Sequence, residues 1–264
     1  LQDIADAFAG VEPSPRSPAT ACDYALAETA ALSRAAVARR ATALARTVAS
    51  GRRDPFPSPS SQVSTLRTTL GAQTVGRIRA TAARADVTVF ALVCAGFESA
   101  VSTVLRPGRF LYATAVAHRE NPDFHHVAGC LINTTPIASS MSSVPPGDTG
   151  RLLTAVSRRV VEALSAAHLP YPDLLAALRQ RGVHQPPHRF LLVHDSPLRL
   201  RLGDQEPAGL CLPPVVARSD VSVSLNDCGE RFDVHLHVDS ARVGERTARS
   251  LLSSFERSLG KLTD

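Results

Sequence analysis

The alternation of apolar and polar residues is clearest between Arg109 and Ile137, where it predicts two strands joined by a polar loop. The first strand has two faces: Phe110, Tyr112, Thr114 and Val116 on one, and Leu111, Ala113 and Ala115 on the other. The chain then passes through the segment HRENPDFHH and returns through Gly129 to a second apolar run. Because loops at strand ends often carry function, we expect this stretch to form the wall of a site.

Helical spacing of apolar residues dominates the chain before this stretch. Helices are expected over residues 1–10, 23–49 and 72–85, with a β-prone segment at 62–70 and a Pro/Ser-rich connector at 51–61. A strongly apolar helix is expected next, beginning at a cap on Asp86 or Thr88 and reaching Leu105. Its apolar residues recur at helical spacing, which is typical of a buried core helix.

Helices and strands mix in the remainder of the chain. Helices are expected over residues 149–167 and 173–181, and a last helix is expected to be capped by Ser240. Strands are expected over residues 189–194, 220–225 and 232–238, the last two as a hairpin around residues 226–229. Because the order lacks a regular βαβ repeat, the pattern predicts an α+β fold, a mixed β-sheet with helices packed on it.

The composition is that of a chain that can bury a core, since 44% of the 264 residues are hydrophobic. This length suits one large domain or two small ones, at roughly 100–200 residues per domain. The longest apolar run, Val87 to Phe97, falls short of the roughly 20 residues that a spanning helix needs. We therefore expect no membrane segment, and a cytoplasmic location, because the start shows no signal-peptide pattern.

The net charge of +5 and the pI near 9.3 would suit an anionic partner. Lys261 is the single lysine, so the basic side is almost entirely arginine. The arginines are scattered along the predicted helices and are not grouped with aromatic residues, and no base-stacking motif accompanies them. We therefore expect no nucleic-acid partner.

The five cysteines show no CxxC spacing and are odd in number: Cys22, Cys94, Cys130, Cys211 and Cys228. They are expected to be reduced thiols, and a zinc site is not expected. His235 and His237 alternate along a predicted strand and could chelate a metal, but no third ligand is placed near them. An exposed polar face is the favoured interpretation of that pair.

His125 and His126 are the most conspicuous candidates for proton transfer, because an imidazole can take up and return a proton at neutral pH. Because this pair of histidines has no other catalytic signal around it, a solvated loop is nevertheless the favoured interpretation. The sequence contains no GxSxG elbow, no GxxxxGK[ST] loop and no GxGxxG loop. The residues alone therefore predict an α+β domain without assigning a reaction.

A series of motifs, in order along nearly the whole chain, resembles one family. The matching segments are 1–10, Asp23-Tyr24-Ala25, DVTVF at 86–90, AVAHR at 115–119, GCLINT at 129–134, HLPYPDLL at 168–175 and DVSV at 220–223. They resemble the C-terminal half of the condensation domains of nonribosomal peptide synthetases, which belong to the chloramphenicol-acetyltransferase-like acyltransferases. The resemblance implies that residues 1–264 are the C-terminal lobe of such a domain, with the linking helix that follows the HHxxxDG motif.

The family implies a site shared by two lobes. Phosphopantetheine arms of two carrier proteins deliver an acyl donor and an amine acceptor into a tunnel between the lobes, as substrates and not as bound cofactors. The second His of HHxxxDG orients or deprotonates the amine, and the motif's Asp is held by the arginine that matches Arg119. The strand that carries Gly129, Asn133 and Thr134 is expected to line the tunnel. The expected partners are carrier proteins and the N-terminal lobe.

The chain departs from the family pattern at two places. HHxxxDG is absent, because His125 and His126 continue as Val-Ala-Gly-Cys-Leu, and the arginine that often closes the NTxPxR segment is Ala138. No catalytic residue is therefore assigned within the chain, and the catalytic histidine is expected before Leu1. On this interpretation the chain is not competent alone.

Two alternatives remain open. Ala138 and His118 leave room for a fragment of an O-acyltransferase of the same superfamily, which would form lipid or polyketide esters. A degenerate, non-catalytic module that only docks carrier proteins is the alternative from another class.

Overall fold

The computed structural model describes residues 7, 9–11, 19–48, 62–119, 121–141, 144–145, 147–184, 186–195 and 214–264. The helix expected at residues 1–10 lies largely outside these ranges, as do the connector at 51–61 and Cys211. The described helices are α2 (Ala21–Ala31), α3 (Arg34–Thr47), α4 (Ala72–Arg84), α5 (Val89–Val104), α6 (Thr149–Leu164), α7 (Tyr171–Gln180) and α8 (Glu245–Thr263), with short 3-10 turns at Pro122–Phe124 and Pro187–Arg189.

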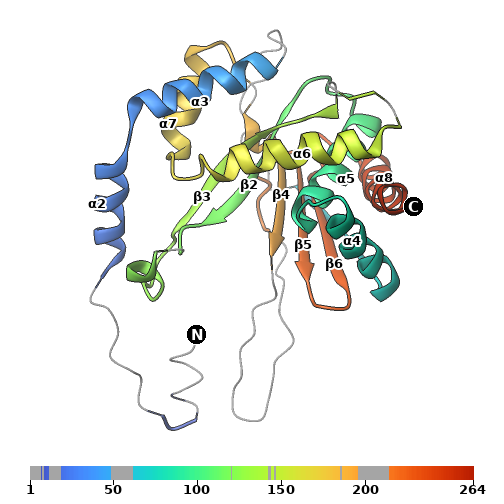
Figure 1. Ribbon diagram of the computed structural model, residues 1–264, viewed down its shortest axis with the longest axis horizontal. Coiled ribbons are helices and arrows are strands. Elements are labelled where there is room, and N and C mark those ends of the chain that lie inside the picture. The colour runs from blue at the N-terminus through green and yellow to red at the C-terminus, as the bar shows by residue number, and fades with distance from the viewer. Residues whose placement is uncertain are drawn as a thin grey trace.

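One mixed sheet organises the molecule (Figure 1). Its strands are β1 (Val63–Leu70), β2 (Leu111–Ala117), β3 (Ile132–Ala138), β4 (Phe190–Asp195), β5 (Val221–Asp227) and β6 (Phe232–Asp239). They lie in the order β1-β6-β5-β4-β2-β3. Strand β4 runs parallel to β2 and β5, and the other neighbours are antiparallel. This arrangement confirms the predicted α+β class.

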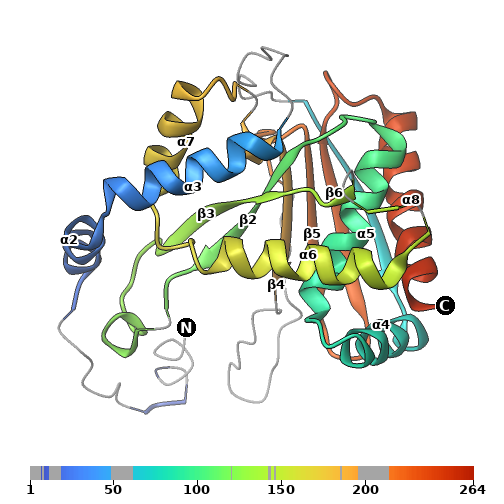
Figure 2. The same ribbon diagram turned by 45° about the horizontal axis from the view of Figure 1, so that its top comes forward.

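Helices pack on both faces of the sheet, and two hydrophobic clusters result. The main core joins residues of α4, α5, α6 and α8 to all six strands, whereas a second cluster joins α3 and α7 to the β2–β3 end (Figure 2). Strand β2 shows the division, because Tyr112 belongs to the main core and Leu111 to the second cluster. The predicted alternation is therefore confirmed, but the first half of β2 is buried on both faces.

Two predicted boundaries are wrong for identifiable reasons. The helix expected over residues 23–49 is interrupted, because Leu32 is extended and Ser33 caps a new helix by accepting a hydrogen bond from the N–H of Ala36. The last helix begins at Glu245 and not at Ser240, whose hydroxyl instead donates to the carbonyl of Gln62. The predicted cap at Thr88 is confirmed.

A buried carboxyl group ties the central helix α5 to the β2–β3 hairpin. Glu98 is fully buried and accepts hydrogen bonds from the Tyr112 hydroxyl at 3.0 Å, the Ser139 hydroxyl at 3.2 Å and the Ser140 N–H at 2.6 Å. Burial raises the pKa of Glu98 to about 7, an effect that these three donors oppose. The segment that leaves β3 is thus anchored on a group that titrates near neutrality.

Within the described ranges, no single helix is long and apolar enough to cross a membrane. Helices α4 and α5 meet such a criterion only as a pair bent by 108°.

We predict that Glu98 makes the stability fall as the pH rises from 5 to 8. Its folded-state pKa of about 7 lies above the ordinary 4.5, so the stabilisation is fully present below the unfolded pKa and is lost as the pH rises through the folded one. The loss is on the order of 3 kcal/mol. Glu98→Gln, which mimics the neutral acid, should flatten the dependence in urea unfolding at pH 5 and pH 8. Equal slopes in the two proteins would contradict this role.

Candidate functional site

The guanidinium of Arg119 lies inside the loop that joins β2 to β3. Nη1 donates to the carbonyls of Phe124 at 3.4 Å, His125 at 3.2 Å and Val127 at 2.9 Å. Nη2 donates to the carbonyl of Gly129 at 3.0 Å. We call this arrangement the carbonyl cradle. It fixes the path of the loop, because four backbone acceptors converge on one side chain.

The cradle leaves a formal positive charge without a described counter-ion. In the part of the chain that the structure describes, no carboxylate forms an ion pair with Arg119. Carbonyl dipoles orient the guanidinium but do not neutralise it. A planar cation held in this way is suited to bind a carboxylate from another segment.

Tyr24 connects helix α2 to the same loop. Its ring packs edge-on against Phe124 at a centroid distance of 5.4 Å and lies 6.2 Å from the ring of His118. Gly129 is also close to α2, since a Cβ atom there would lie 3.0 Å from the Cβ of Ala21. A side chain at this position would require the loop or Ala21 to shift by a few tenths of an ångström, which favours the glycine of the GCLINT segment.

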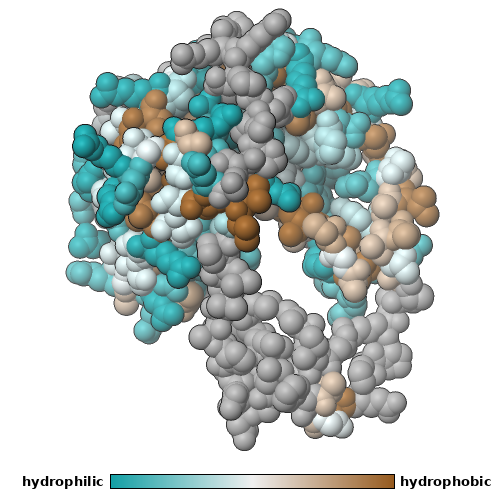
Figure 3. All heavy atoms as spheres, turned by 180° about the vertical axis from the view of Figure 1, so that it is seen from behind, coloured by the Kyte–Doolittle hydropathy of each residue, from teal (hydrophilic) through white to brown (hydrophobic). Residues whose placement is uncertain are grey.

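Helix α2 otherwise stands away from the body of the molecule. None of its residues is buried, and Leu26 is 69% exposed. Pale and brown spheres cover this helix in the space-filling view (Figure 3). Its position therefore depends mainly on the contacts of its first turns with the loop.

Asn133 ties β3 to the connection between α6 and α7. Its amide donates to the carbonyls of Ala167 at 2.6 Å and Leu169 at 2.7 Å, and its oxygen accepts from the N–H of Tyr171 at 3.2 Å. The side chain is only 9% exposed. Asn133 thus holds the HLPYPDLL segment in place and has no donor left for a ligand.

Thr134 points to the other face of the sheet, because successive residues of a strand alternate. It pairs with Ala115 across the β2–β3 ladder, and Ile132, two residues before it, is 61% exposed. On this face, Ala115 and Ile132 are exposed, whereas Pro136 is buried. Asn133 and Thr134 therefore cannot line the same surface, although both fall in the expected tunnel segment.

His125 and His126 are both exposed, and their rings meet edge-on at a centroid distance of 6.5 Å. Only the carbonyl of His125 takes part in the cradle. This placement agrees with a solvated loop and gives neither imidazole a proton-transfer partner among the described residues.

The exposed face predicted for His235 and His237 is wrong. Both side chains are only 9% exposed, because β6 lies between β1 and β5. The Nδ1 atom of His237 lies 2.9 Å from the Thr65 hydroxyl, and burial lowers the pKa of both imidazoles. No group of three or more metal-binding side chains occurs among the described residues, so nothing supports a metal site here.

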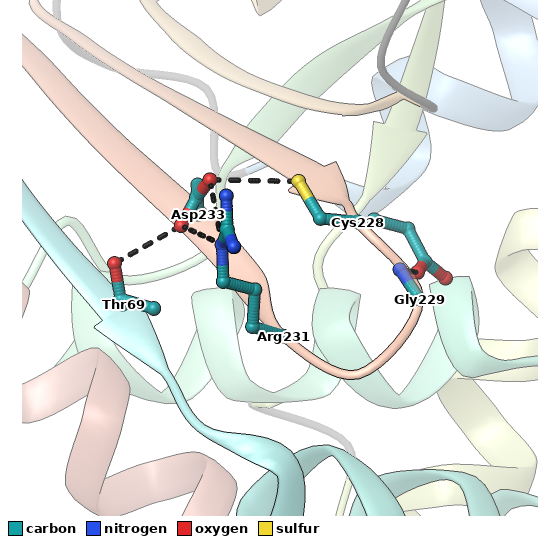
Figure 4. Close-up of polar contacts among 6 residues, drawn as sticks. Thr69, Cys228, Gly229, Arg231 and Asp233 are labelled. Atoms are coloured by element: carbon teal, nitrogen blue, oxygen red, sulfur yellow. Dashed lines mark hydrogen bonds and ion pairs between the residues drawn. The ribbon is translucent and has the colours of Figure 1, made fainter. Parts of the chain in front are cut away.

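The cysteines that the structure describes are free thiols. At the β5–β6 turn, Cys228 donates to the carboxylate of Asp233 at 3.4 Å, beside the contacts of Thr69 and Arg231 with the same group (Figure 4). Desolvation, followed by the hydrogen bond to Asp233, raises the pKa of the Cys228 thiol. A thiol in this state is a poor nucleophile at neutral pH.

Asp220, in the DVSV segment, supports the opposite end of the sheet. It is 2% exposed and forms ion pairs with Arg189 and Arg242. It therefore joins the start of β4 to the turn after β6. The DVSV match drew attention to Asp220, but its two partners lie too far away in sequence to be predicted.

Residues 40–187, more than half of the chain, match the family model described as Condensation domain. No curated protein matches the sequence. Among solved structures, the condensation domain from the monacolin K polyketide synthase MokA is 17% identical, with a TM-score of 0.76 over 98% of this chain and 63% of its own.

Two further structures show the same fold. The PapA2 acyl transferase is 18% identical, with a TM-score of 0.69 over 98% of this chain and 59% of its own. The epimerization domain from the third module of tyrocidine synthetase B is 13% identical, with a TM-score of 0.71 over 98% of this chain and 62% of its own. The chain therefore spans about three fifths of the length of these structures, and the sheet and helices match the expected chloramphenicol-acetyltransferase-like lobe.

We predict that Asn133→Ala lowers the free energy of unfolding by about 2–4 kcal/mol, because two buried carbonyls and one N–H lose their partner. Asn121→Ala is the control, since Asn121 is exposed and accepts a single bond from the Asp123 N–H. It should cost less than about 1 kcal/mol. Urea unfolding of the two variants measures both values. Equal losses would show that Asn133 is not a main anchor of the α6–α7 connection.

Proposed function

Because the chain belongs to the condensation domain family, we propose that it is the C-terminal lobe of a condensation-type acyltransferase. This enzyme joins a carrier-bound acyl donor to a carrier-bound amine acceptor. The amine nitrogen attacks the thioester carbonyl, a C–N bond forms, the C–S bond breaks, and the donor thiol leaves with a proton. The histidine that assists this step comes from an HHxxxDG motif outside the chain.

The observation that carries the proposal is the carbonyl cradle around Arg119. An arginine that is oriented by four carbonyls and has no described carboxylate partner suits the role of holding the Asp of HHxxxDG. In this role Arg119 touches no substrate. It is a positioning residue, which fixes the loop of the catalytic histidine relative to the bound thioester.

Gly129 and Thr134 serve the same site in different ways. Gly129 lets the cradle loop approach α2, while Thr134 lies on the accessible face of β3 beside Ala115. Ala115 and Ile132 on this face are exposed, and we assign this end of the strand to the pantetheine arm. Asn133 supports the wall from behind, since its amide donates only to the α6–α7 connection and its oxygen accepts from the N–H groups of Tyr171 and Thr134.

Ester formation is the second candidate. Ala138, which replaces the arginine of the family segment, is 3% exposed and packs in the second hydrophobic cluster with Leu111. The chain therefore lacks the arginine that often closes this family segment, and an acyl transferase is among the structures that share the fold. An acceptor screen with an amine and an alcohol decides between the two reactions. A docking module without activity would give no product with either acceptor.

We predict that Arg119→Ala in the intact protein lowers kcat about 100-fold, with little change in KM for the carrier-bound substrates. Added guanidinium should restore part of the rate, which a purely structural defect would not allow. Arg77→Ala is the control, because Arg77 forms only an exposed ion pair with Asp264. Unchanged turnover in a correctly folded Arg119→Ala protein would rule this role out.

A further inference from the structure

Two adjacent helices, α3 and α7, carry an excess of basic over acidic residues. Helix α3 contains four arginines and no acidic residue, and α7 with the next residue adds Arg179 and Arg181 against one acid, Asp173. This segment pair holds six basic residues and one acidic residue, which leaves 23 of each among the 29 and 24 of the whole chain. This segment pair therefore accounts arithmetically for the net charge of +5, while the other basic residues remain scattered along the chain among an equal number of acids.

The stability of helix α3 does not explain these arginines. Its first residue is Arg34, and its first turn contains no acidic residue. A cation at a helix N-terminus opposes the macrodipole, so this charge weakens the helix. Among the described residues, Arg39 and Arg46 form no ion pair, and both are exposed.

The outer side of the helix pair is hollowed. A depression of about 400 Å³ is lined by Ala38, Arg39, Thr42, Ala43, Arg46 and Arg181. Three small residues and three arginines thus share this lining. Arg181 is held in position, because Nε donates to the Thr42 hydroxyl at 2.8 Å and Nη1 to the carbonyl of Ala177 at 2.9 Å. We call this surface the α3–α7 basic face.

The spacing of the arginines fits a helical partner. Arg39 and Arg46 are seven residues apart on α3, which is about 10 Å along the helix axis. Carboxylates two turns apart on a facing helix have the same separation, and the small lining residues Ala38, Thr42 and Ala43 allow that helix to come close. A nucleic acid is less suited, since α3 has no aromatic side chain on which a base could stack and Tyr171 of α7 is half-buried.

We propose that the α3–α7 basic face is a docking surface for an acidic helix of a carrier protein. The inference rests on the proposed function, which requires carrier-bound substrates, and it adds the place and the chemistry of recognition. The face lies one layer away from the candidate site, because the side chain of Arg40 in α3 donates to the carbonyl of Pro136 in β3. A carrier seated there is held mainly by charge, so its binding weakens as salt screens the arginines.

The test uses the intact protein and a phosphopantetheinylated carrier domain of a nonribosomal peptide synthetase. The double variant Arg39→Glu/Arg46→Glu should raise the Kd for the carrier about 10-fold or more and flatten its dependence on salt between about 50 mM and about 500 mM. It should lower kcat/KM for a carrier-borne donor by a similar factor. The rate with a soluble pantetheine thioester, which has no protein to dock, should stay unchanged.

Arg246→Glu/Arg257→Glu is the matched control. Both residues are exposed on α8, at the other end of the sheet (Figure 1), and the double reversal changes the net charge by the same amount. A carrier Kd that is unchanged by the α3 variant, or changed equally by the control, overturns the proposal. The proposal is also overturned if single-stranded DNA binds the wild-type protein more tightly than the carrier does and the α3 variant loses that binding. This result would assign the face to nucleic acid.

The result separates this inference from the proposed function. If the wild-type protein forms no product but its carrier Kd responds to the α3 variant alone, the proposed reaction fails and the docking surface stands. If product forms and the α3 variant behaves as the wild type with carrier-borne donors, the reaction stands and the docking surface fails.

Discussion

A backbone that leaves a sheet must find new partners for its carbonyl groups, and this requirement shapes the connection between β2 and β3. Arg119 meets it for four carbonyls at once. The loop is therefore built around a cation, and Gly129 allows it to lie against α2. The same geometry leaves the charge available to a carboxylate, so the structural role of the arginine and its proposed role in the site have one cause.

Strand β3 is fixed at both ends by buried polar groups. Near its start, Asn133 binds the connection between α6 and α7, and just after its end, Ser140 donates to Glu98 of α5. Burying either polar group without hydrogen-bond partners costs free energy, so each group stabilises the position of the segment that it binds. The strand that carries Thr134 is consequently a rigid wall between the two hydrophobic clusters. Its outer neighbour α3 carries the basic face, which places the proposed carrier contact next to the proposed site.

Much of the fold could be predicted from the sequence, because apolar periodicity records which faces are buried. The alternation in β2, the apolar helix α5 and the cap at Thr88 all follow from local patterns. Contacts between segments that are far apart in the sequence produce no such periodic pattern. The burial of His235 depends on the neighbours of β6, and the clustering of the arginines depends on how α7 packs against α3. Arg119 matched a family motif, but its partners are carbonyls, which any residue can supply.

The central claim is that the guanidinium of Arg119 holds the loop, and amide hydrogen exchange tests it most directly. The N–H groups of Phe124, His125 and Val127 bond to carbonyls within the loop, whereas the amides of β2 belong to the sheet. In Arg119→Ala, the three loop amides should exchange about 10-fold faster or more, while those of β2 keep their wild-type rates. Unchanged exchange in the loop would contradict the account.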